Sequence, residues 1–131
     1  MKLLLDTHIW VWSVLDRTRL SDRVINALQD PGNELWLSPI SLWEVLTFCQ
    51  KGRLLLFPTP PEWIANALAT VPMREAQVTY QVANETGSVQ LPHRDPADRF
   101  LIATARVFDL TLVTADERVI EARSVAVLEN R

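Results

Sequence analysis

The stretch KLLLDTHIW, residues 2–10, decides the fold that we expect for this chain. Leu3, Leu4 and Leu5 form a short apolar run of the kind that makes a buried strand. The run ends directly at Asp6, so this carboxylate is predicted to lie at the mouth of the strand. In open α/β sheets, ligands bind at the carboxyl edge of the strands. Asp6 could also be the N-cap of the helix that follows, and the two roles are compatible.

Apolar runs and helical patterns alternate along the rest of the chain. Strands are expected at residues 2–5, 34–37, 71–73, 110–113 and 125–128. Helices are expected at residues 8–15, 21–29, 39–52, 60–69, 75–86, 97–108 and 117–122. Proline after a capping residue marks three of the helix starts. This alternation predicts an α/β protein with a mostly parallel central sheet, and 131 residues form a single domain, 1–131.

The composition fits a compact globular protein. Apolar residues make up 48% of the chain, and the single cysteine, Cys49, excludes an internal disulfide framework. No segment resembles a signal peptide or reaches the roughly 20 apolar residues of a membrane span, so a cytoplasmic location is expected. The net charge of −3 argues against broad non-specific binding to duplex nucleic acid.

Three further acids lie at or within apolar segments. Glu44 in SPISLWEVL has Ile40 and Phe48 four residues before and after it, so it is expected to share their inward-facing stripe. An isolated buried carboxylate is costly, and either a metal ion or an arginine would satisfy it. In HRDPADRFLIATA, Asp95 precedes a proline and is the expected N-cap, which makes Asp98, on the same side of the first helical turn, the candidate metal ligand. The alternative is that Asp95 itself is the ligand.

Asp116 follows the apolar strand of LTLVTADERV and is either a helix cap or a ligand. If Asp6, Glu44, Asp98 and Asp116 converge, they form a site for a hard divalent cation such as Mg²⁺, with Mn²⁺ as the alternative. The two histidines lack a zinc-binding spacing. With the four acids set aside, 13 basic residues face 12 acidic ones, so the acidic total is compatible with an RNA-binding protein.

The segments LLLDTHIWVW, Trp43-Glu44, HRDPADRFLIATA and LVTADERV, in this order, resemble the PIN-domain ribonucleases over about residues 2–128. The likeness is greatest to the VapC-type toxins of type II toxin–antitoxin pairs. It implies a three-layer α/β/α PIN-like fold and a Mg²⁺-dependent endoribonuclease in which metal-activated water cleaves RNA. The four acids are the implied catalytic and metal-binding residues. Arg94 and Arg99 are the implied contacts to RNA phosphates, with an ion pair to a neighbouring acid as the alternative for Arg99. The hydroxyls of Thr7 and Thr114 could orient ligands or metal-bound water, or the two could simply be turn residues.

The resemblance also implies two protein partners, a cognate VapB-type antitoxin and a second copy of the chain. The segments 9–15 and 40–49 are so rich in apolar residues that the interior of one small domain cannot bury both completely. We therefore expect another chain to cover part of their surface, including Trp10 or Trp12. Two alternatives stay open. One is a catalytically silent PIN-like binding module, and the other is a receiver-type phospho-acceptor domain, although Lys2 and Lys51 do not follow a late strand.

Overall fold

The computed structural model describes residues 1–92 and 95–131. In this part of the chain five strands form one sheet in the order β3-β2-β1-β4-β5, and each neighbouring pair is parallel. The last strand begins at Val127 rather than at the predicted Val125. The strands are β1 (Lys2–Leu5), β2 (Glu34–Leu37), β3 (Arg74–Glu75), β4 (Thr111–Thr114) and β5 (Val127–Glu129). The predicted parallel sheet is confirmed.

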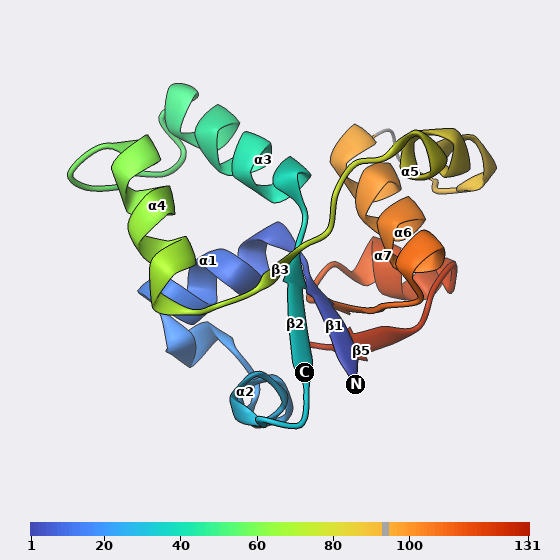
Figure 1. Ribbon diagram of the computed structural model, residues 1–131, viewed down its shortest axis with the longest axis horizontal. Coiled ribbons are helices and arrows are strands. Elements are labelled where there is room, and N and C mark those ends of the chain that lie inside the picture. Colours follow the sequence, from blue (N-terminus) through green and yellow to red (C-terminus); the bar gives the residue numbers. More distant parts are fainter. Residues whose placement is uncertain (93–94) are drawn as a thin grey trace.

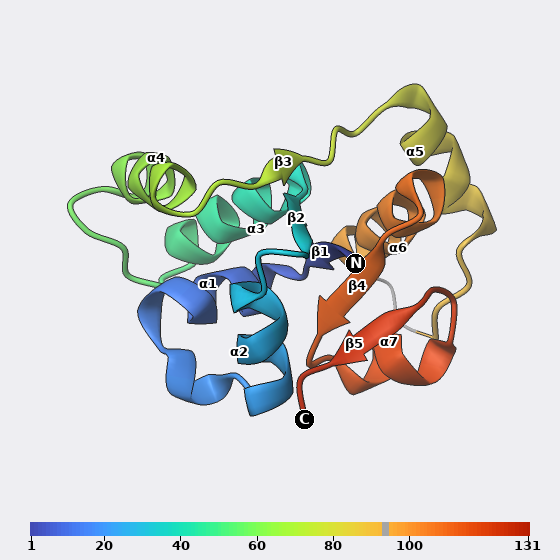
Figure 2. The same cartoon turned by 60° about the horizontal axis from the view of Figure 1, so that its bottom comes forward.

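Helices cover both faces of the sheet, which gives three layers (Figure 1). One face carries α1 (Thr7–Leu15), α2 (Asp22–Gln29), α3 (Pro39–Gln50) and α4 (Pro60–Thr70). The opposite face carries α5 (Tyr80–Glu85), α6 (Pro96–Phe108) and α7 (Glu117–Ala122). Short 3₁₀ turns, η1 (Arg17–Arg19) and η2 (Thr86–Ser88), follow α1 and α5. Figure 2 shows the same sheet between its two helical layers from a second direction.

The first strand explains why the sheet is buried on both faces. Leu3 and Leu5 point into the core on the side of α1 to α4, and Leu4 points into the core on the other side. All three side chains are at most 2% exposed. A strand without a polar face needs helices on both sides, and this is the arrangement that the apolar run predicted.

Side-chain caps fix the starts of three helices. Ser38 accepts a hydrogen bond from the backbone N–H of Ile40, Thr59 from that of Glu62, and Asp95 from that of Ala97. A proline occupies the first turn of each of these helices. Because proline lacks the N–H that a helix start leaves unpaired, it stabilises this position. The predicted starts of α3, α4 and α6 are confirmed.

The third strand and the helix after it differ from the prediction. Residues 71–73 are not a strand, because the pairing with β2 falls on Arg74 and Glu75 instead. The backbone N–H of Ala76 extends this pairing to the carbonyl of Leu37 at 2.9 Å. The helix therefore begins at Tyr80, behind the cap Thr79, and not at residue 75. Backbone pairing at the sheet edge outweighs the local sequence pattern here.

The chain runs outward from β1 in both directions, because β2 and β3 lie on one side of it and β4 and β5 on the other. The strand order therefore changes direction between β1 and β4, which leaves a crevice at the carboxyl ends of these two strands. Ligands usually bind at this position in open α/β sheets. No helix in the described part of the chain is long and apolar enough to span a bilayer.

Candidate active site

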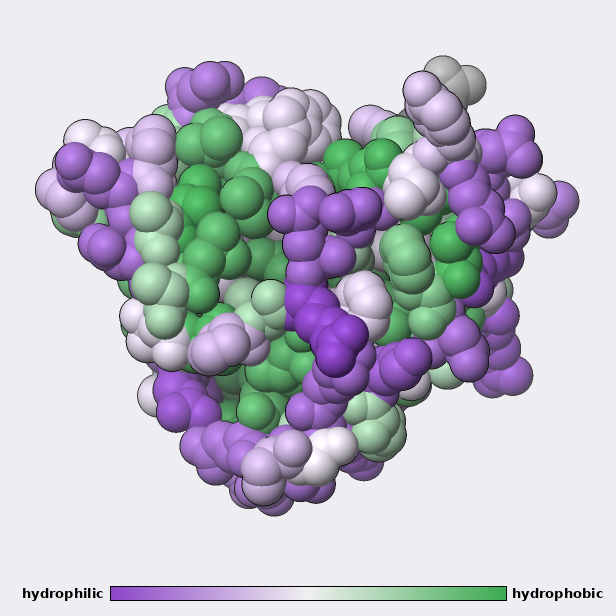
Figure 3. Space-filling model, viewed as in Figure 1, coloured by the Kyte–Doolittle hydropathy of each residue, from purple (hydrophilic) through white to green (hydrophobic). Residues whose placement is uncertain are grey.

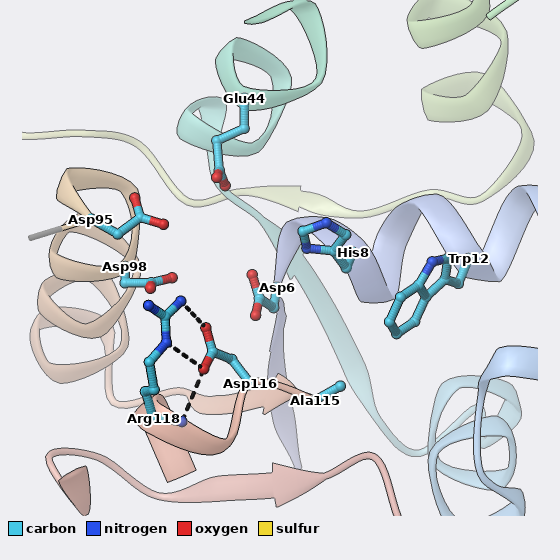
Figure 4. A pocket seen from close by; sticks show the side chains of 9 residues that line it. All are labelled: Asp6, His8, Trp12, Glu44, Asp95, Asp98, Ala115, Asp116 and Arg118. Atoms are coloured by element: carbon cyan, nitrogen blue, oxygen red, sulfur yellow. Dashed lines mark hydrogen bonds and ion pairs between the residues drawn. The ribbon is translucent and has the colours of Figure 1, made fainter. Parts of the chain in front are cut away.

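A pocket of about 370 Å³ opens at the carboxyl ends of β1 and β4. The four predicted acids all contribute to its wall, although they come from four separate segments of the chain. Figure 4 shows their carboxylates facing the same space. The lining residues are Asp6, His8, Trp12, Glu44, Asp95, Asp98, Ala115, Asp116 and Arg118.

Asp6 is the most constrained of the acids. Its side chain is 7% exposed and accepts hydrogen bonds from the Thr7 backbone N–H at 2.7 Å and the Thr114 hydroxyl at 2.6 Å. Burial raises the pKa of Asp6, and these two hydrogen bonds oppose the rise. The carboxylate therefore has a fixed direction but little solvent to stabilise its charge, and a nearby cation would stabilise it strongly.

Glu44 reaches the pocket from the opposite wall, on α3. It is half-buried, and it accepts a hydrogen bond from the hydroxyl of Thr7, which also contacts the Ser41 hydroxyl at 2.9 Å. Burial, with help from the charges of Asp6, Asp95 and Asp98, raises the pKa of Glu44 to about 7. Near neutral pH this carboxyl is poised between its charged and neutral forms.

The predicted orientation of α3 needs a correction. Ser41 and Val45 are the fully buried positions of this helix, whereas Glu44 and its neighbours Ile40 and Phe48 are half-buried. Glu44 therefore flanks the buried stripe and does not lie within it. Because α3 turns Ser41 and Val45 toward the core, the carboxylate of Glu44 lies in the wall of the pocket instead of in the core.

Asp95 and Asp98 both lie at the start of α6, at the positions that the sequence predicted. Asp95 is the N-cap, and its side chain accepts the backbone N–H of Ala97 at 3.0 Å. Asp98 is in the first turn, is 7% exposed and lines the pocket. The positive end of the helix dipole favours negative charge at this position.

Asp116 is a helix cap and also lines the pocket. It begins α7 by accepting the backbone N–H of Arg118 at 2.9 Å. The Arg118 guanidinium turns back onto the same carboxylate, with Nε 3.3 Å from Oδ1 and Nη2 3.2 Å from Oδ2. Burial alone would raise the pKa of Asp116, but the hydrogen bonds and charge of Arg118 outweigh burial and lower it.

The four residues expected to orient or bind substrate are placed differently from one another. Thr114 bridges two acids, because its hydroxyl donates to Asp6 and accepts the backbone N–H of Asp116 at 3.0 Å. Arg99 donates to the carbonyl of Val89 at 2.6 Å and ties α6 to the preceding segment. Its predicted contact with RNA stays a prediction. Arg94 lies outside the described residues.

Arg118 lines the pocket although it was not among the residues predicted from the sequence. The signal was present in the spacing, since an arginine two residues after an N-cap aspartate can fold back onto it. His8 and Trp12 were also not assigned to the pocket. Their rings lie 5.6 Å apart on α1 and close one side of the pocket.

The donor chemistry of the pocket fits a hard divalent cation, because five of its nine lining residues carry a carboxylate. As they stand, the described side chains form no group of three or more Asp, Glu, His or Cys residues arranged to hold a metal ion. Asp6, Glu44 and Asp116 are held by Thr114, Thr7 and Arg118 respectively. Ligation by these acids therefore requires side-chain movement, above all the departure of Arg118 from Asp116.

Comparison with known proteins shows the family of the chain. A family model described as PIN domain matches residues 3–125. The chain is 32% identical over 119 residues to Ribonuclease VapC22 of Mycobacterium tuberculosis (strain ATCC 25618 / H37Rv), with 88% of each chain covered.

Solved structures show the same fold at lower sequence identity. The crystal structure of VapBC2 from Rickettsia felis bound to a DNA fragment from their promoter contains a chain with a TM-score of 0.72 and 15% identity, covering 98% of both chains. DNA-bound VapBC from Salmonella typhimurium gives a TM-score of 0.67 at 17% identity, covering 100% of this chain and 99% of the other. FitAcB from Neisseria gonorrhoeae gives 0.60 at 23% identity, covering 98% and 97%.

Proposed function

Because this chain belongs to the PIN-domain family, we propose that it is a divalent-metal-dependent endoribonuclease and the toxin of a VapBC-type toxin–antitoxin pair. The observation that carries this proposal is the pocket at the carboxyl ends of β1 and β4, which Asp6, Glu44, Asp98 and Asp116 all line. The relative with 32% identity is named as a ribonuclease, which supports the same activity here.

The four acids would hold Mg²⁺, or Mn²⁺ in its place. When bound, such a cation lowers the pKa of water and stabilises the charge that develops on a phosphodiester. Asp6 contributes a carboxylate whose direction is fixed by Thr7 and Thr114. Glu44 lies close to the charges of Asp6, Asp95 and Asp98, and a bound cation would offset this crowding and favour the charged form of its carboxylate.

RNA would enter from the open side of the pocket. Thr7 and Thr114 orient the acids, and Arg94 and Arg99 are the residues that we propose to contact RNA phosphates. The chain as a whole carries a charge of −3, so attraction to RNA depends on local basic groups and on the cation in the pocket. We also propose that the protein acts in the cytoplasm.

The antitoxin would dock on the apolar grooves beside the segment that connects α4 to β3. Two grooves meet there at Met73, one lined by Leu42 and Leu68 and the other by Val14 and Val71. These four side chains are half-buried or exposed. Figure 3 shows hydrophobic side chains gathered over α4 and next to it on this face. An apolar helix of an antitoxin fits such a groove.

Trp10 lines the second groove, but it is only 1% exposed because it packs within the chain against Trp63, with the two ring centroids 5.6 Å apart. Another chain would therefore find almost none of its surface, and the alternative expectation, that a partner covers the half-buried Trp12, stays a prediction. Trp43, which is 53% exposed, offers a better surface. It lies in an apolar patch formed by α3 and α6 next to the acid pocket, and we propose that a second copy of the chain docks there. The patch residues are Ile40, Trp43, Pro96, Ala97 and Phe100.

The proposed activity is tested by removing one carboxylate. Asp98→Asn should abolish cleavage of single-stranded RNA in Mg²⁺ and weaken Mn²⁺ binding measured by calorimetry, while near-ultraviolet circular dichroism stays unchanged. Asp109→Asn is the matched control, because Asp109 ends the same helix in the left-handed region that asparagine tolerates. Cleavage by Asp98→Asn at the wild-type rate would show that the site assignment is wrong.

The two alternatives predict different results. A silent binding module would fail to cut RNA even as the wild-type chain with Mg²⁺ or Mn²⁺ added. A receiver-type domain would accept phosphate on an aspartate, but the order β3-β2-β1-β4-β5 differs from the 2-1-3-4-5 order of the receiver fold. The sheet therefore favours the nuclease over the receiver.

A further inference from the structure

Arg118 is the one arginine that lines the acid pocket among the residues that the structure describes. Its guanidinium contacts both oxygens of Asp116, with Nε on one and Nη2 on the other. Figure 4 shows this pair at the edge of the pocket, on the side where Asp98 also lies. The side chain of Arg118 is 56% exposed, against 25% for Asp116.

This ion pair is easily exchanged. Arg118 is the exposed partner of the pair, so water can solvate its guanidinium when it leaves Asp116, and contacts of such exposed side chains contribute little net free energy. The guanidinium also faces the charges of Asp98 and Asp95, and both favour its charged form. Arg118 is thus attracted by the pocket as a whole, and its contact with Asp116 can be broken at small cost.

A divalent cation in the pocket would compete with Arg118 directly. The cation would require carboxylate oxygens from Asp6, Asp98 and Asp116, and Arg118 holds both oxygens of Asp116. Like charges repel, so a cation in the pocket also weakens the attraction that keeps the guanidinium there. Arg118 would remain tethered at the mouth, since it belongs to the first turn of α7.

We infer that Arg118 exchanges its partner during the reaction cycle, from the Asp116 carboxylate to a phosphate of the RNA. This inference rests on the proposed function. The guanidinium fork that now contacts two carboxylate oxygens has the right geometry to contact two phosphate oxygens. Arg118 therefore has two opposing effects: it lowers the affinity of the site for metal and raises its affinity for RNA.

The opposing effects give the inference a distinctive test with Arg118→Gln, which keeps the length of the side chain but removes its charge. Without RNA, calorimetry should show that Mn²⁺ binds the variant about two- to fivefold more tightly, the gain expected from removing an exposed ion pair. With a fluorogenic single-stranded oligoribonucleotide in saturating Mg²⁺, kcat/KM should fall on the order of tenfold, as expected for one lost charge-assisted contact. Arg118→Lys should give an intermediate kcat/KM, because lysine keeps the charge without the fork.

Arg131→Gln is the matched control. Arg131 follows β5 and pairs at 3.5 Å with Glu117, which lies in the same first turn of α7 as Arg118. Its side chain is similarly exposed, but it does not line the pocket. Its substitution should leave both measurements at the wild-type values. If Arg118 merely stabilises the start of α7, Arg118→Gln will unfold more readily but bind Mn²⁺ no more tightly, and the inference fails.

The same experiment separates this inference from the proposed function. If the wild-type chain binds Mn²⁺ and cuts RNA while Arg118→Gln matches it in both assays, the nuclease stands and the exchange of Arg118 is refuted. A wild-type chain that neither binds Mn²⁺ nor cuts RNA would overturn the proposed function, and the inference about Arg118 with it.

Discussion

Replacing Glu44 by glutamine should stabilise the folded chain at alkaline pH and have little effect in acid. In the unfolded chain the Glu44 carboxyl has its ordinary pKa of 4.5, whereas in the folded chain burial raises the pKa to about 7. Below about pH 4.5 the group is protonated in both states and burial costs nothing. Between these two values the folded chain keeps a proton that the unfolded chain loses, so the free energy of unfolding falls as pH rises. Above about pH 7 the carboxyl is charged in both states, and the free energy of unfolding has lost its full contribution from this group.

The size of the effect follows from the same two pKa values. At about 1.4 kcal/mol per pH unit, a rise from 4.5 to about 7 sets a ceiling of roughly 3.4 kcal/mol. Glu44 is only half-buried, and solvent screening reduces this ceiling, so we expect about 1–2 kcal/mol. Glutamine keeps an oxygen that can accept the Thr7 hydroxyl, so the contact with α1 is retained.

Urea denaturation in EDTA at about pH 5 and about pH 8.5 measures this difference directly. Glu44→Gln should be more stable than wild type by about 1–2 kcal/mol at the higher pH and by much less at the lower one. Glu121→Gln, a change of the same type at an exposed position of α7, is the control. If Glu44→Gln is destabilised at about pH 8.5, or if its effect is the same at both pH values, then burial of this carboxylate is not the cost that the structure indicates.

Three further predictions concern the metal, the core and the dimer. Mg²⁺ at about one hundred times its dissociation constant should stabilise the wild-type chain by about 2.7 kcal/mol, and EDTA should reverse this in a thermal melt; an unchanged melting temperature would argue against metal binding. Trp10→Ala should lower the free energy of unfolding by about 3–5 kcal/mol in urea, because the side chain is buried in the core of the chain; a loss below about 1 kcal/mol would contradict that placement. Trp43→Glu should reduce the mass measured by light scattering to that of one chain, and an unaltered dimer would place the interface elsewhere.

The central strand and the acid that follows it could be predicted from the sequence because both depend on local chemistry. An uninterrupted leucine run cannot make a strand with a solvated face, and Asp6 directly after it cannot lie anywhere but at the strand end. The start of α6 was predictable for a similar reason. A proline fixed the first turn, so the roles of Asp95 and Asp98 followed from their positions.

Features that depend on distant partners could not be predicted in the same way. β3 exists because β2 offers an unpaired edge, and nothing in residues 71–76 alone states which of them will meet it. The rotation of α3, which moves Glu44 from the buried stripe to the pocket wall, is decided by packing around Val45. The position of the Arg118 guanidinium depends on a side-chain rotamer that its own neighbour Asp116 selects.

The hydrogen bond from Thr114 to Asp6 joins residues that are 108 positions apart, and β4 is paired with β1 at the same place. Closing so long a loop is among the later and entropically more expensive steps in folding. Until β4 pairs with β1, Asp6 and Asp116 lie in separate parts of a partly folded chain. The helices that form before this step cannot replace the part of the pocket that Asp116 lines. The nuclease activity that we propose would therefore be absent from the newly made chain until folding is finished, and a cell would be exposed to it only from that point.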